Sequence, residues 1–364
     1  MSDPGLDAIN VVHLGRVEYE DGLVLQERFF KARQQGLIGD VLLLLEHSPV
    51  LTLGRAAKPA NILLPRPALQ KMGFEVFETN RGGDVTYHGP GQLVGYPIFK
   101  LDGARQDVRR YVRDLEEALI RTVAKWGITA GRIPKLTGVW LGDETSPDAR
   151  KIAAIGVHIA RWITSHGFAL NVNTDLSHFR VIVPCGIQEK GVTSIAAEIG
   201  REVPLAEVES EVASHFAALF GKPLRHLWPE RRTISVAVTK GQGDDAKVLL
   251  LKRTPERGGF WQLVTGTVES GETPNAAAAR EVREETGRAL EVRPLDYVHA
   301  FAFGETTPPG LVEETAFAAA WPDDAPVSID PREHTELAWV SVAEAMERLP
   351  FAGLRIASRR ALVR

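Results

Sequence analysis

The pattern of apolar and polar residues in the first part of the chain predicts a mixture of buried strands and long helices. Residues 41–46 form a continuous apolar run that ends at a Ser-Pro turn, which is typical of a buried strand. A helix is expected over residues 108–126, with Gly127 in the position where helices commonly stop. Further strands are expected over residues 152–158 and 167–172. This mixture favours an α/β or α+β fold over a helical bundle or a sandwich.

A break in this pattern near residue 230 divides the chain. The helical pattern of residues 205–219 stops at Gly221, and two prolines shortly after it prevent its continuation. A strand-like run then starts afresh. We therefore expect a first domain of residues 1–229 and a second domain of residues 230–364.

The second domain is predicted to contain three strands, a central helix, further strands and a final helix. Two or three strands and a final helix are expected after its central helix. The elements before them are strands over residues 233–239, 247–252 and 262–265, followed by a helix over residues 275–286.

Length, charge and cysteine content narrow the class of protein. The 364 residues suffice for two domains with their own cores. Residues 1–229 carry equal numbers of acidic and basic side chains, so the whole net charge of −4 lies in residues 230–364. Such a small charge does not indicate a nucleic-acid or membrane-binding surface. The single cysteine excludes internal disulfides and Cys-pair metal sites.

Targeting signals are not recognisable in the sequence. No segment approaches the roughly 18 apolar residues of a transmembrane helix. The first 15 residues include Asp3 and Asp7 and lack the basic start and apolar run of a signal peptide. Together with the cysteine content, these features predict a cytoplasmic protein.

A glycine-rich stretch and the cysteine are the candidate chemical features of the first domain. Residues 81–92 hold four glycines around a Tyr-His pair, which indicates either an irregular loop or a binding cleft where backbone approaches a ligand. Cys185 lies between Pro184 and Gly186, a context that favours a turn and therefore exposure. The thiol is thus either inert or a nucleophile.

A nucleophilic cysteine needs a base or a cation beside it, because an ordinary thiol is only a few per cent ionised at pH 7. Lys151 opens an apolar strand, where partial desolvation favours its neutral form. The residues alone do not choose among the candidates, which are His88, His158, His166, His178 and Lys151.

Five motifs in this order resemble the octanoyltransferase family, also called lipoyl(octanoyl) transferases. They span roughly residues 10–220. The motifs are Arg81-Gly-Gly-x-x-Thr-Tyr-His-Gly-Pro-Gly-Gln92, Gly138-Val-Trp140, Lys151-Ile-Ala-Ala-Ile-Gly-Val-His158, His166-Gly-Phe-Ala-Leu-Asn-Val172 and Pro184-Cys-Gly186. The resemblance implies the biotin/lipoate protein ligase fold and transfer of octanoyl from acyl carrier protein, without a cofactor, to a lysine of lipoyl domains. Those domains belong to 2-oxoacid dehydrogenases and the glycine cleavage H protein.

The resemblance also implies roles for individual residues. Cys185 matches the nucleophile that carries the acyl group as a thioester, and Lys151 matches the lysine that acts as general acid and base. The stretches that match the acyl-binding residues contain Arg81, Gly82, Gly83, Asp84, Val85, Thr86, Tyr87, His88, Ala154, Ile155, Gly156, His158, Gly167, Phe168 and Ala169.

Carboxylates at helical spacing are the candidate feature of the second domain. Thr273 can cap a helix that begins at a proline. Glu281, Glu284 and Glu285 then share one face of that helix, where like charges repel unless a cation offsets them. Hard divalent ions prefer such oxygen ligands, although a solvated Glu/Arg helix face explains the same spacing.

The pattern Gly266-x5-Glu272-x7-Arg280-Glu281-Val282-x-Glu284-Glu285-x-Gly287 resembles the Nudix box. This resemblance favours the metal-binding interpretation. The resemblance implies an α/β/α sandwich that hydrolyses small nucleotide-like diphosphates. It implies Mg²⁺ or Mn²⁺ bound by Glu281, Glu284 and Glu285. The supporting positions are Gly266, Glu272 and Arg280, of which Arg280 is expected to orient a carboxylate; Arg288 departs from the usual apolar residue after the box.

The sequence around the box resembles the dihydroneopterin triphosphate pyrophosphatase branch. Phe260 and Trp261 are candidates for stacking on a base or pterin, although aromatic residues before a strand are as often part of a core. Glu333 or His334 is a candidate base outside the helix.

Two other interpretations stay open. In the first, the Nudix-like domain is a non-catalytic nucleotide-binding or regulatory module of the transferase. In the other, the first domain is a lipoate or biotin ligase that uses ATP and needs no thiol nucleophile. The leading prediction is an octanoyltransferase fused to a Nudix hydrolase.

Overall fold

The computed structural model describes residues 5–183, 190–304, 309–322 and 325–362. The chain folds into two compact units. The first contains Met1–Trp228, and the second contains Pro229–Phe303 and Gly310–Arg364. Among the described residues, no helix combines the length and the apolar character needed to span a membrane.

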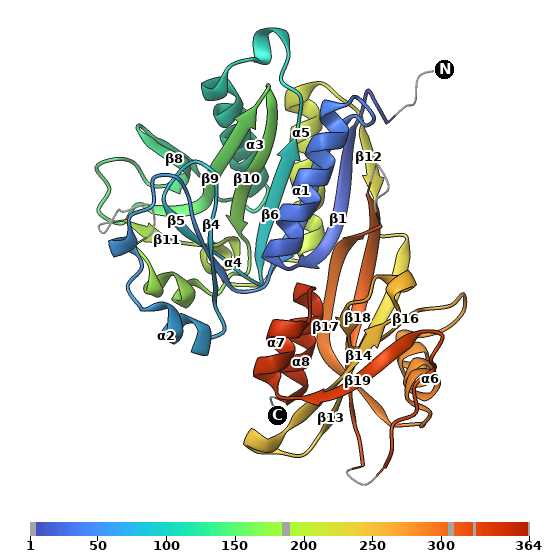
Figure 1. The fold of residues 1–364 in the computed structure, drawn as a ribbon. Coiled ribbons are helices and arrows are strands. Elements are labelled where there is room, and N and C mark those ends of the chain that lie inside the picture. The colour runs from blue at the N-terminus through green and yellow to red at the C-terminus, as the bar shows by residue number, and fades with distance from the viewer. Residues whose placement is uncertain (1–4, 184–189, 305–308, 323–324, 363–364) are drawn as a thin grey trace. The chain divides into compact units, whose positions relative to one another are not determined.

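The first unit is built on a nine-stranded mixed sheet, shown in Figure 1. The strand order is β12–β1–β2–β6–β10–β9–β8–β7, and β11 pairs with β9. The strands are β1 Ile9–Val17, β2 Asp40–His47, β6 Gln92–Ile98, β7 Gly131–Ile133, β8 Leu136–Leu141, β9 Arg150–Ala160, β10 Ile163–Asn171, β11 Gly191–Val192 and β12 Leu224–Leu227. A smaller sheet has the order β4–β3–β5 and consists of β3 Val50–Leu53, β4 Glu75–Glu78 and β5 Val85–His88.

Helices cover both faces of the large sheet. The α-helices of this unit are α1 Tyr19–Gln34, α2 Arg66–Lys71, α3 Val108–Ala124, α4 Ile195–Ile199 and α5 Leu205–Phe220. Leu42 and Leu44 of β2 belong to the core under α3 and α5. His47 lies on the opposite face of the same strand and contacts Gly22 of α1. Because both faces are covered, β2 is buried throughout its apolar run, as the sequence predicts.

The predicted helix and strands of this unit form where the local signals are strong. The side chain of Asp107 caps α3 by accepting hydrogen bonds from the backbone amides of Arg109 and Arg110. Gly127, beyond its end, has a positive φ of 73°. The expected strand at residues 152–158 lies within β9, and the one at residues 167–172 extends one residue beyond the end of β10.

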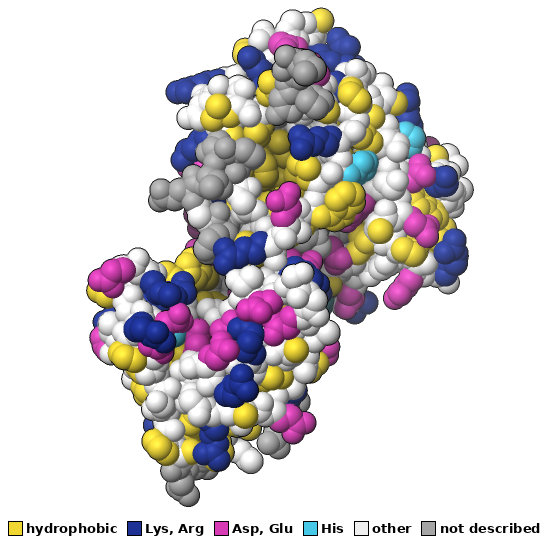
Figure 2. All heavy atoms as spheres, turned by 90° about the vertical axis from the view of Figure 1, so that its right-hand side faces the viewer, with side chains coloured by type: hydrophobic (Ala, Val, Ile, Leu, Met, Phe, Trp, Pro, Cys, Tyr) yellow, Lys and Arg dark blue, Asp and Glu magenta, His cyan; other side chains and the backbone are white. Residues whose placement is uncertain are grey.

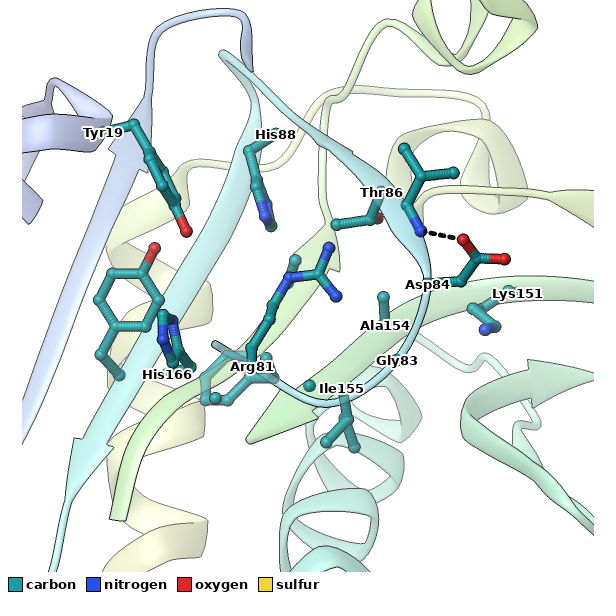
Figure 3. Close-up of a pocket in the computed structure, with 16 residues that line it drawn as sticks. Tyr19, Arg81, Gly83, Asp84, Thr86, His88, Lys151, Ala154, Ile155 and His166 are labelled. Carbon is teal, nitrogen blue, oxygen red and sulfur yellow. Dashed lines mark hydrogen bonds between the residues drawn. The ribbon is translucent and has the colours of Figure 1, made fainter. Parts of the chain in front are cut away.

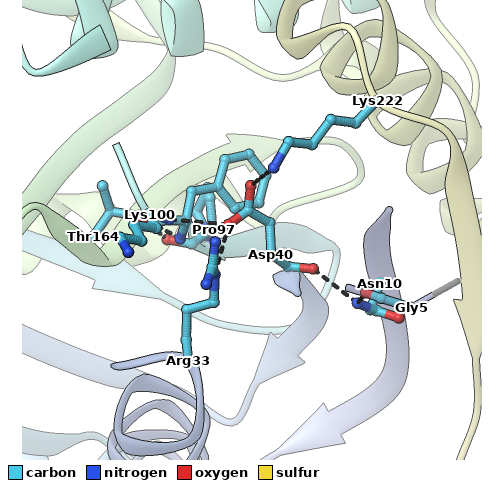
Figure 4. A network of polar contacts seen from close by, with 9 residues as sticks. Gly5, Asn10, Arg33, Asp40, Pro97, Lys100, Thr164 and Lys222 are labelled. Carbon is cyan, nitrogen blue, oxygen red and sulfur yellow. Dashed lines mark hydrogen bonds and ion pairs between the residues drawn. The ribbon is translucent and has the colours of Figure 1, made fainter. Parts of the chain in front are cut away.

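One buried carboxylate joins four segments of the first unit (Figure 4). Asp40, at the start of β2, is 2% exposed. It accepts hydrogen bonds from Arg33 Nε at 2.9 Å, Lys222 Nζ at 2.5 Å and the backbone amide of Lys100 at 3.0 Å. The carbonyl oxygen of Asp40 also accepts from Asn10 Nδ2 at 3.1 Å. These contacts tie the end of α1 and the segment after α5 to the start of β2.

The second unit has a seven-stranded sheet between two helical layers. The order is β15–β14–β13–β18–β17, with β16 paired to β13 and β19 paired to β14. The strands are β13 Arg231–Lys240, β14 Lys247–Arg253, β15 Trp261–Gln262, β16 Val264–Thr267, β17 Val292–Phe303, β18 Gly310–Ala320 and β19 His334–Val340. The helices are α6 Pro274–Thr286, α7 Val342–Arg348 and α8 Ala352–Leu362.

The two layers of the second unit enclose separate cores. Val282 of α6 packs with Val236 of β13, whereas Ala357 of α8 packs with Ala237 on the opposite face of that strand. Two helices, α7 and α8, stand where the sequence predicts one final helix. The mixed α/β class predicted for both parts of the chain is confirmed.

Candidate functional site

A cavity in the first unit brings the predicted motifs together (Figure 3). Its atom-free space, open solvent at the mouth included, is about 510 Å³. The lining residues are Tyr19, Arg81, Gly83, Asp84, Val85, Thr86, His88, Tyr96, Lys151, Ala154, Ile155, Gly156, His166, Gly167, Phe168 and Ala169.

Three of the residues expected at this site do not line the cavity. The amide of Gly82 donates to the carbonyl oxygen of Val157 at 3.0 Å, so this glycine holds the loop against β9. Tyr87 points the other way and its hydroxyl lies 2.8 Å from Nδ1 of His178. His158 lines a second cavity.

Strand register explains why distant motifs meet here. In the antiparallel pair of β9 and β10, Gly156 lies opposite Gly167, and Ala154 lies opposite Ala169. A Cβ atom at Gly156 would lie 2.8 Å from the carbonyl oxygen of Gly82. The glycine at this position therefore lets the loop before β5 approach β9 closely.

Tyr19 and Tyr96 belong to the cavity but were not singled out from the sequence. Tyr19 begins α1, and Tyr96 lies in the buried strand β6. Burial raises the pKa of Tyr19 to about 12, and it raises the pKa of Tyr96 well above its usual value. Both hydroxyls are therefore uncharged at neutral pH. In the sequence, each resembles an ordinary core aromatic residue.

Arg81 stands in the middle of the cavity wall and is only 7% exposed. Its Nη2 donates to the carbonyl oxygen of Thr52 at 2.6 Å and to the Thr52 hydroxyl at 2.8 Å. Its Nη1 donates to the carbonyl oxygen of Gly82 at 3.0 Å. The planar guanidinium thus fixes the loop to β3. A lysine ammonium lacks this rigid, planar arrangement of donors.

Lys151 lies at one end of the cavity and is 7% exposed. Its Nζ lies 4.6 Å from the centroid of the Trp140 ring, a cation–π geometry. Gly138 lets β8 approach β9 closely, because a Cβ there would lie 2.6 Å from the carbonyl oxygen of Ala153. The Lys151 side chain therefore packs against Trp140 of the predicted Gly138-Val-Trp140 motif.

The imidazoles around the cavity are uncharged at neutral pH. Burial lowers the pKa of His166 to about 4 and places the pKa of His88 well below 6.5. His88 Nδ1 lies 2.8 Å from Gln92 Oε1, and its Nε2 lies 3.3 Å from the Thr52 hydroxyl. With both ring nitrogens engaged, His88 is a weaker candidate base than Lys151.

Cys185 lies outside the described residues. On its N-terminal side, the amide of Val183 donates to the carbonyl oxygen of Asn61 at 2.8 Å. Asn61 in turn donates through Nδ2 to Asp84 in the cavity wall at 2.5 Å. On its C-terminal side, Val192 of β11 pairs with Lys151 of β9.

The three glutamates of the second unit lie at the C-terminal end of α6. Thr273 caps this helix by accepting from the amide of Ala276. Glu281 lies against β16, because a Cβ at Gly266 would lie 1.9 Å from Oε1 of Glu281. Figure 2 shows acidic and basic side chains side by side on this unit.

Arg280 holds several of these carboxylates. Its Nη1 lies 2.7 Å from Glu281 Oε1 and 3.2 Å from Glu284 Oε2. Its Nε and Nη2 each donate to Glu272 at 3.1 Å. Arg280 thus pairs with Glu272, Glu281 and Glu284.

Glu285 supplies the test of whether these residues fit a metal. Its Oε2 is buried and has no hydrogen-bond partner among the described residues. Burial, followed by the charges of Glu281 and Glu333, raises its pKa well above 4.5. A divalent cation would satisfy this oxygen and offset the repulsion, so the donor set fits such an ion. As placed here, however, the described residues contain no group of three His, Cys, Asp or Glu side chains arranged to hold one.

The two candidate bases outside α6 differ in their surroundings. His334 is buried, and its Nε2 lies 4.0 Å from Glu285 Oε2. Burial lowers its pKa below 6.5. Glu333 is half-buried and forms an ion pair with Arg257 at 3.0 Å. Of the two, His334 lies beside the carboxylate with the unpartnered oxygen.

Comparisons with known proteins divide the chain in the same region. The lipoyl protein ligase A/B catalytic domain matches residues 18–217, and the NUDIX domain matches residues 229–360. An octanoyltransferase of Myxococcus xanthus is 60% identical over 356 residues, covering 98% of this chain and 99% of that protein. An octanoyltransferase of Solibacter usitatus is 56% identical over 207 residues, covering 57% of this chain and 90% of that protein.

A solved structure shares the fold of the first unit. It is a bi-partite lipoate protein ligase from Thermoplasma acidophilum, with 17% sequence identity and a TM-score of 0.51. The similarity covers 61% of this chain and 87% of that one.

Proposed function

Since the chain belongs to the octanoyltransferase family and carries a NUDIX domain, we propose that it transfers octanoyl from octanoyl-acyl carrier protein to a lysine of lipoyl domains through a thioester on Cys185. The acceptors are the lipoyl domains of 2-oxoacid dehydrogenases and the glycine cleavage H protein. Residues 1–229 form the transferase domain and residues 230–364 the hydrolase domain. The observation that carries the proposal is the cavity that joins Lys151 to the three acyl-binding stretches.

The chemistry proceeds in two balanced transfers. Lys151 takes the proton of the Cys185 thiol, and the thiolate attacks the carbonyl carbon of the donor thioester. The donor thiol leaves with that proton. The amine of the target lysine then attacks the enzyme thioester. Lys151 takes the proton that the amine loses and passes it to the departing Cys185 sulfur as the amide forms.

The contacts on either side of Cys185 support its pairing with Lys151. Val192 of β11, on its C-terminal side, pairs with Lys151 of the neighbouring strand β9. Val183, on its N-terminal side, is joined through Asn61 to Asp84 in the cavity wall. Both ends of the segment are therefore anchored to the walls of the cavity.

Transfer of octanoyl to a purified lipoyl domain tests this proposal. Cys185→Ser and Lys151→Met are expected to lower the rate by at least about a thousandfold, because each removes a group that acts in both steps. Lys125→Met, at an exposed surface lysine that pairs with Glu211, is the matched control and should leave the rate unchanged. ATP-dependent transfer of free octanoate by Cys185→Ser would instead support a ligase.

For the second domain we propose hydrolysis of a nucleotide-like diphosphate with Mg²⁺ or Mn²⁺. Glu281, Glu284 and Glu285 would hold the ion, and Arg280 would orient Glu281 and Glu284. The bound ion would neutralise the pyrophosphate and activate water. The unpartnered oxygen of Glu285 supports this assignment.

A regulatory module is the second candidate for this domain. Arg280 already pairs with Glu281 and Glu284, which would suit a domain that binds a nucleotide without hydrolysing it. The two candidates are separated by measuring hydrolysis and binding of a panel of nucleotides with Mg²⁺, including dihydroneopterin triphosphate. Hydrolysis that is lost in Glu284→Gln and kept in Glu347→Gln, at an exposed residue of α7, supports the hydrolase. Binding without such hydrolysis supports the module.

A further inference from the structure

His166 separates the acyl cavity from a second cavity in the same unit. It is the residue that lines both. The second cavity has about 1080 Å³ of atom-free space, open solvent included. It lies between α1 and the end of the β9–β10 hairpin. Its lining residues on α1 are Leu23, Gln26, Glu27, Phe30, Lys31 and Gln34.

The backbone of His166 adopts a conformation that side chains rarely take. Its φ is +54°, which costs on the order of 1–3 kcal/mol for a residue other than glycine. Two hydrogen bonds hold it there. Its backbone amide donates to Oε1 of Gln26 at 2.7 Å, and its Nε2 donates to Oδ1 of Asn80 at 2.7 Å. The imidazole is thus fixed at the boundary between the cavities.

The position of this wall along the cavity is visible in Figure 3. Lys151 lies at one end, whereas His166 and Tyr19 lie at the other, with Arg81 between them. An acyl chain whose carbonyl carbon reacts near Lys151 would therefore extend towards His166. Burial keeps the imidazole uncharged, which suits contact with the end of an alkyl chain.

The geometry points to His166 as the residue that limits the length of the acyl chain, with the second cavity behind it as the space that longer chains would enter. This inference rests on the proposed transferase function. The tail of an acyl chain longer than octanoyl would then lie in the second cavity. The alkyl chain would pass along Leu23 and Phe30 of α1.

His166→Gly is the direct test, because glycine adopts positive φ without strain and removes the wall. Transfer to a lipoyl domain is measured with octanoyl- and dodecanoyl-acyl carrier protein. The rate ratio of dodecanoyl to octanoyl is expected to rise at least about tenfold in the variant. Lys135→Gly, at a positive-φ residue outside both cavities, should leave the ratio unchanged.

A second substitution tests the role of the space behind the wall. In the His166→Gly background, Leu23→Trp fills the second cavity and should restore the preference for octanoyl. His166→Asn, which also tolerates positive φ, replaces the glycine variant if that variant does not fold. An unchanged chain-length ratio in a folded His166 variant overturns the inference. Absence of octanoyl transfer by the parent protein would instead overturn the proposed function.

Discussion

The ammonium group of Lys151 lies over the ring of Trp140, 4.6 Å from its centroid. The two residues come from the neighbouring strands β9 and β8, where Trp140 lies directly opposite Lys151 in the register. The indole ring therefore lies where it can help to position the ammonium of the candidate acid–base residue. This relationship makes Trp140 a positioning residue.

Trp140→Leu is expected to lower kcat for octanoyl transfer by about tenfold with little change in KM for the donor, because the ring that positions the Lys151 side chain is lost. Trp140→Phe keeps an aromatic face and should retain most of the rate. Steady-state kinetics across pH 6–9 would check this. Equal losses in the leucine and phenylalanine variants would show that the ring acts only through packing.

Asp40→Asn should destabilise the first unit by about 3 kcal/mol, because it removes the negative charge that Arg33 and Lys222 share in a buried place. Calorimetry of the full chain measures the shift of the corresponding transition. Asp102→Asn, at an exposed aspartate, is the control and should change little. Equal melting curves for the two variants would contradict the role given to the Asp40 network.

Glu314 makes the stability of the second unit depend on pH. Burial raises its pKa to about 7, and the facing His299, 3.8 Å away, is uncharged because burial lowers its pKa to about 4. Since the folded chain favours the protonated carboxyl, this contribution to stability is fully present below pH 4.5 and is lost as the pH rises through 7.

Glu314→Gln should therefore stabilise the second unit at pH 8 by on the order of 3 kcal/mol and change little at pH 5. Melting temperatures at the two pH values measure the difference. Glu313→Gln, at the adjacent and more exposed residue of β18, should show no such dependence. A gain of equal size at both pH values would contradict the assignment to Glu314.

Divalent metal should stabilise the second unit through Glu285. Millimolar Mg²⁺ is expected to raise its melting temperature by several degrees in the parent protein, because binding to the folded state shifts the unfolding equilibrium. Glu285→Gln should abolish this increase, and it should also raise the melting temperature without metal, since it removes a buried repelling charge. An increase of the same size in both proteins would place the ion elsewhere.

Much of the site could be predicted because its residues carry local signals. Asp107 and Thr273 cap helices that begin where the sequence indicates. The glycines of the acyl-binding stretches are required by close backbone approach, as at Gly156. Glu281, Glu284 and Glu285 share a helix face simply through their spacing.

The remaining features depend on tertiary contacts that leave no pattern in the chain. Tyr19 and Tyr96 reach the cavity only because α1 covers the face of β6 from which Tyr96 projects. The pairing of Arg280 with Glu272, which lies before α6, depends on how that segment packs against the helix. Likewise, the wall at His166 exists because Gln26 and Asn80 hold a residue with positive φ.

Intact-mass measurement after incubation with octanoyl-acyl carrier protein tests the central claim most directly. The account predicts one octanoyl group on the protein, lost on addition of a lipoyl domain and absent in Cys185→Ser. Transfer that proceeds at the normal rate in Cys185→Ser, without any covalent octanoyl adduct, would contradict it.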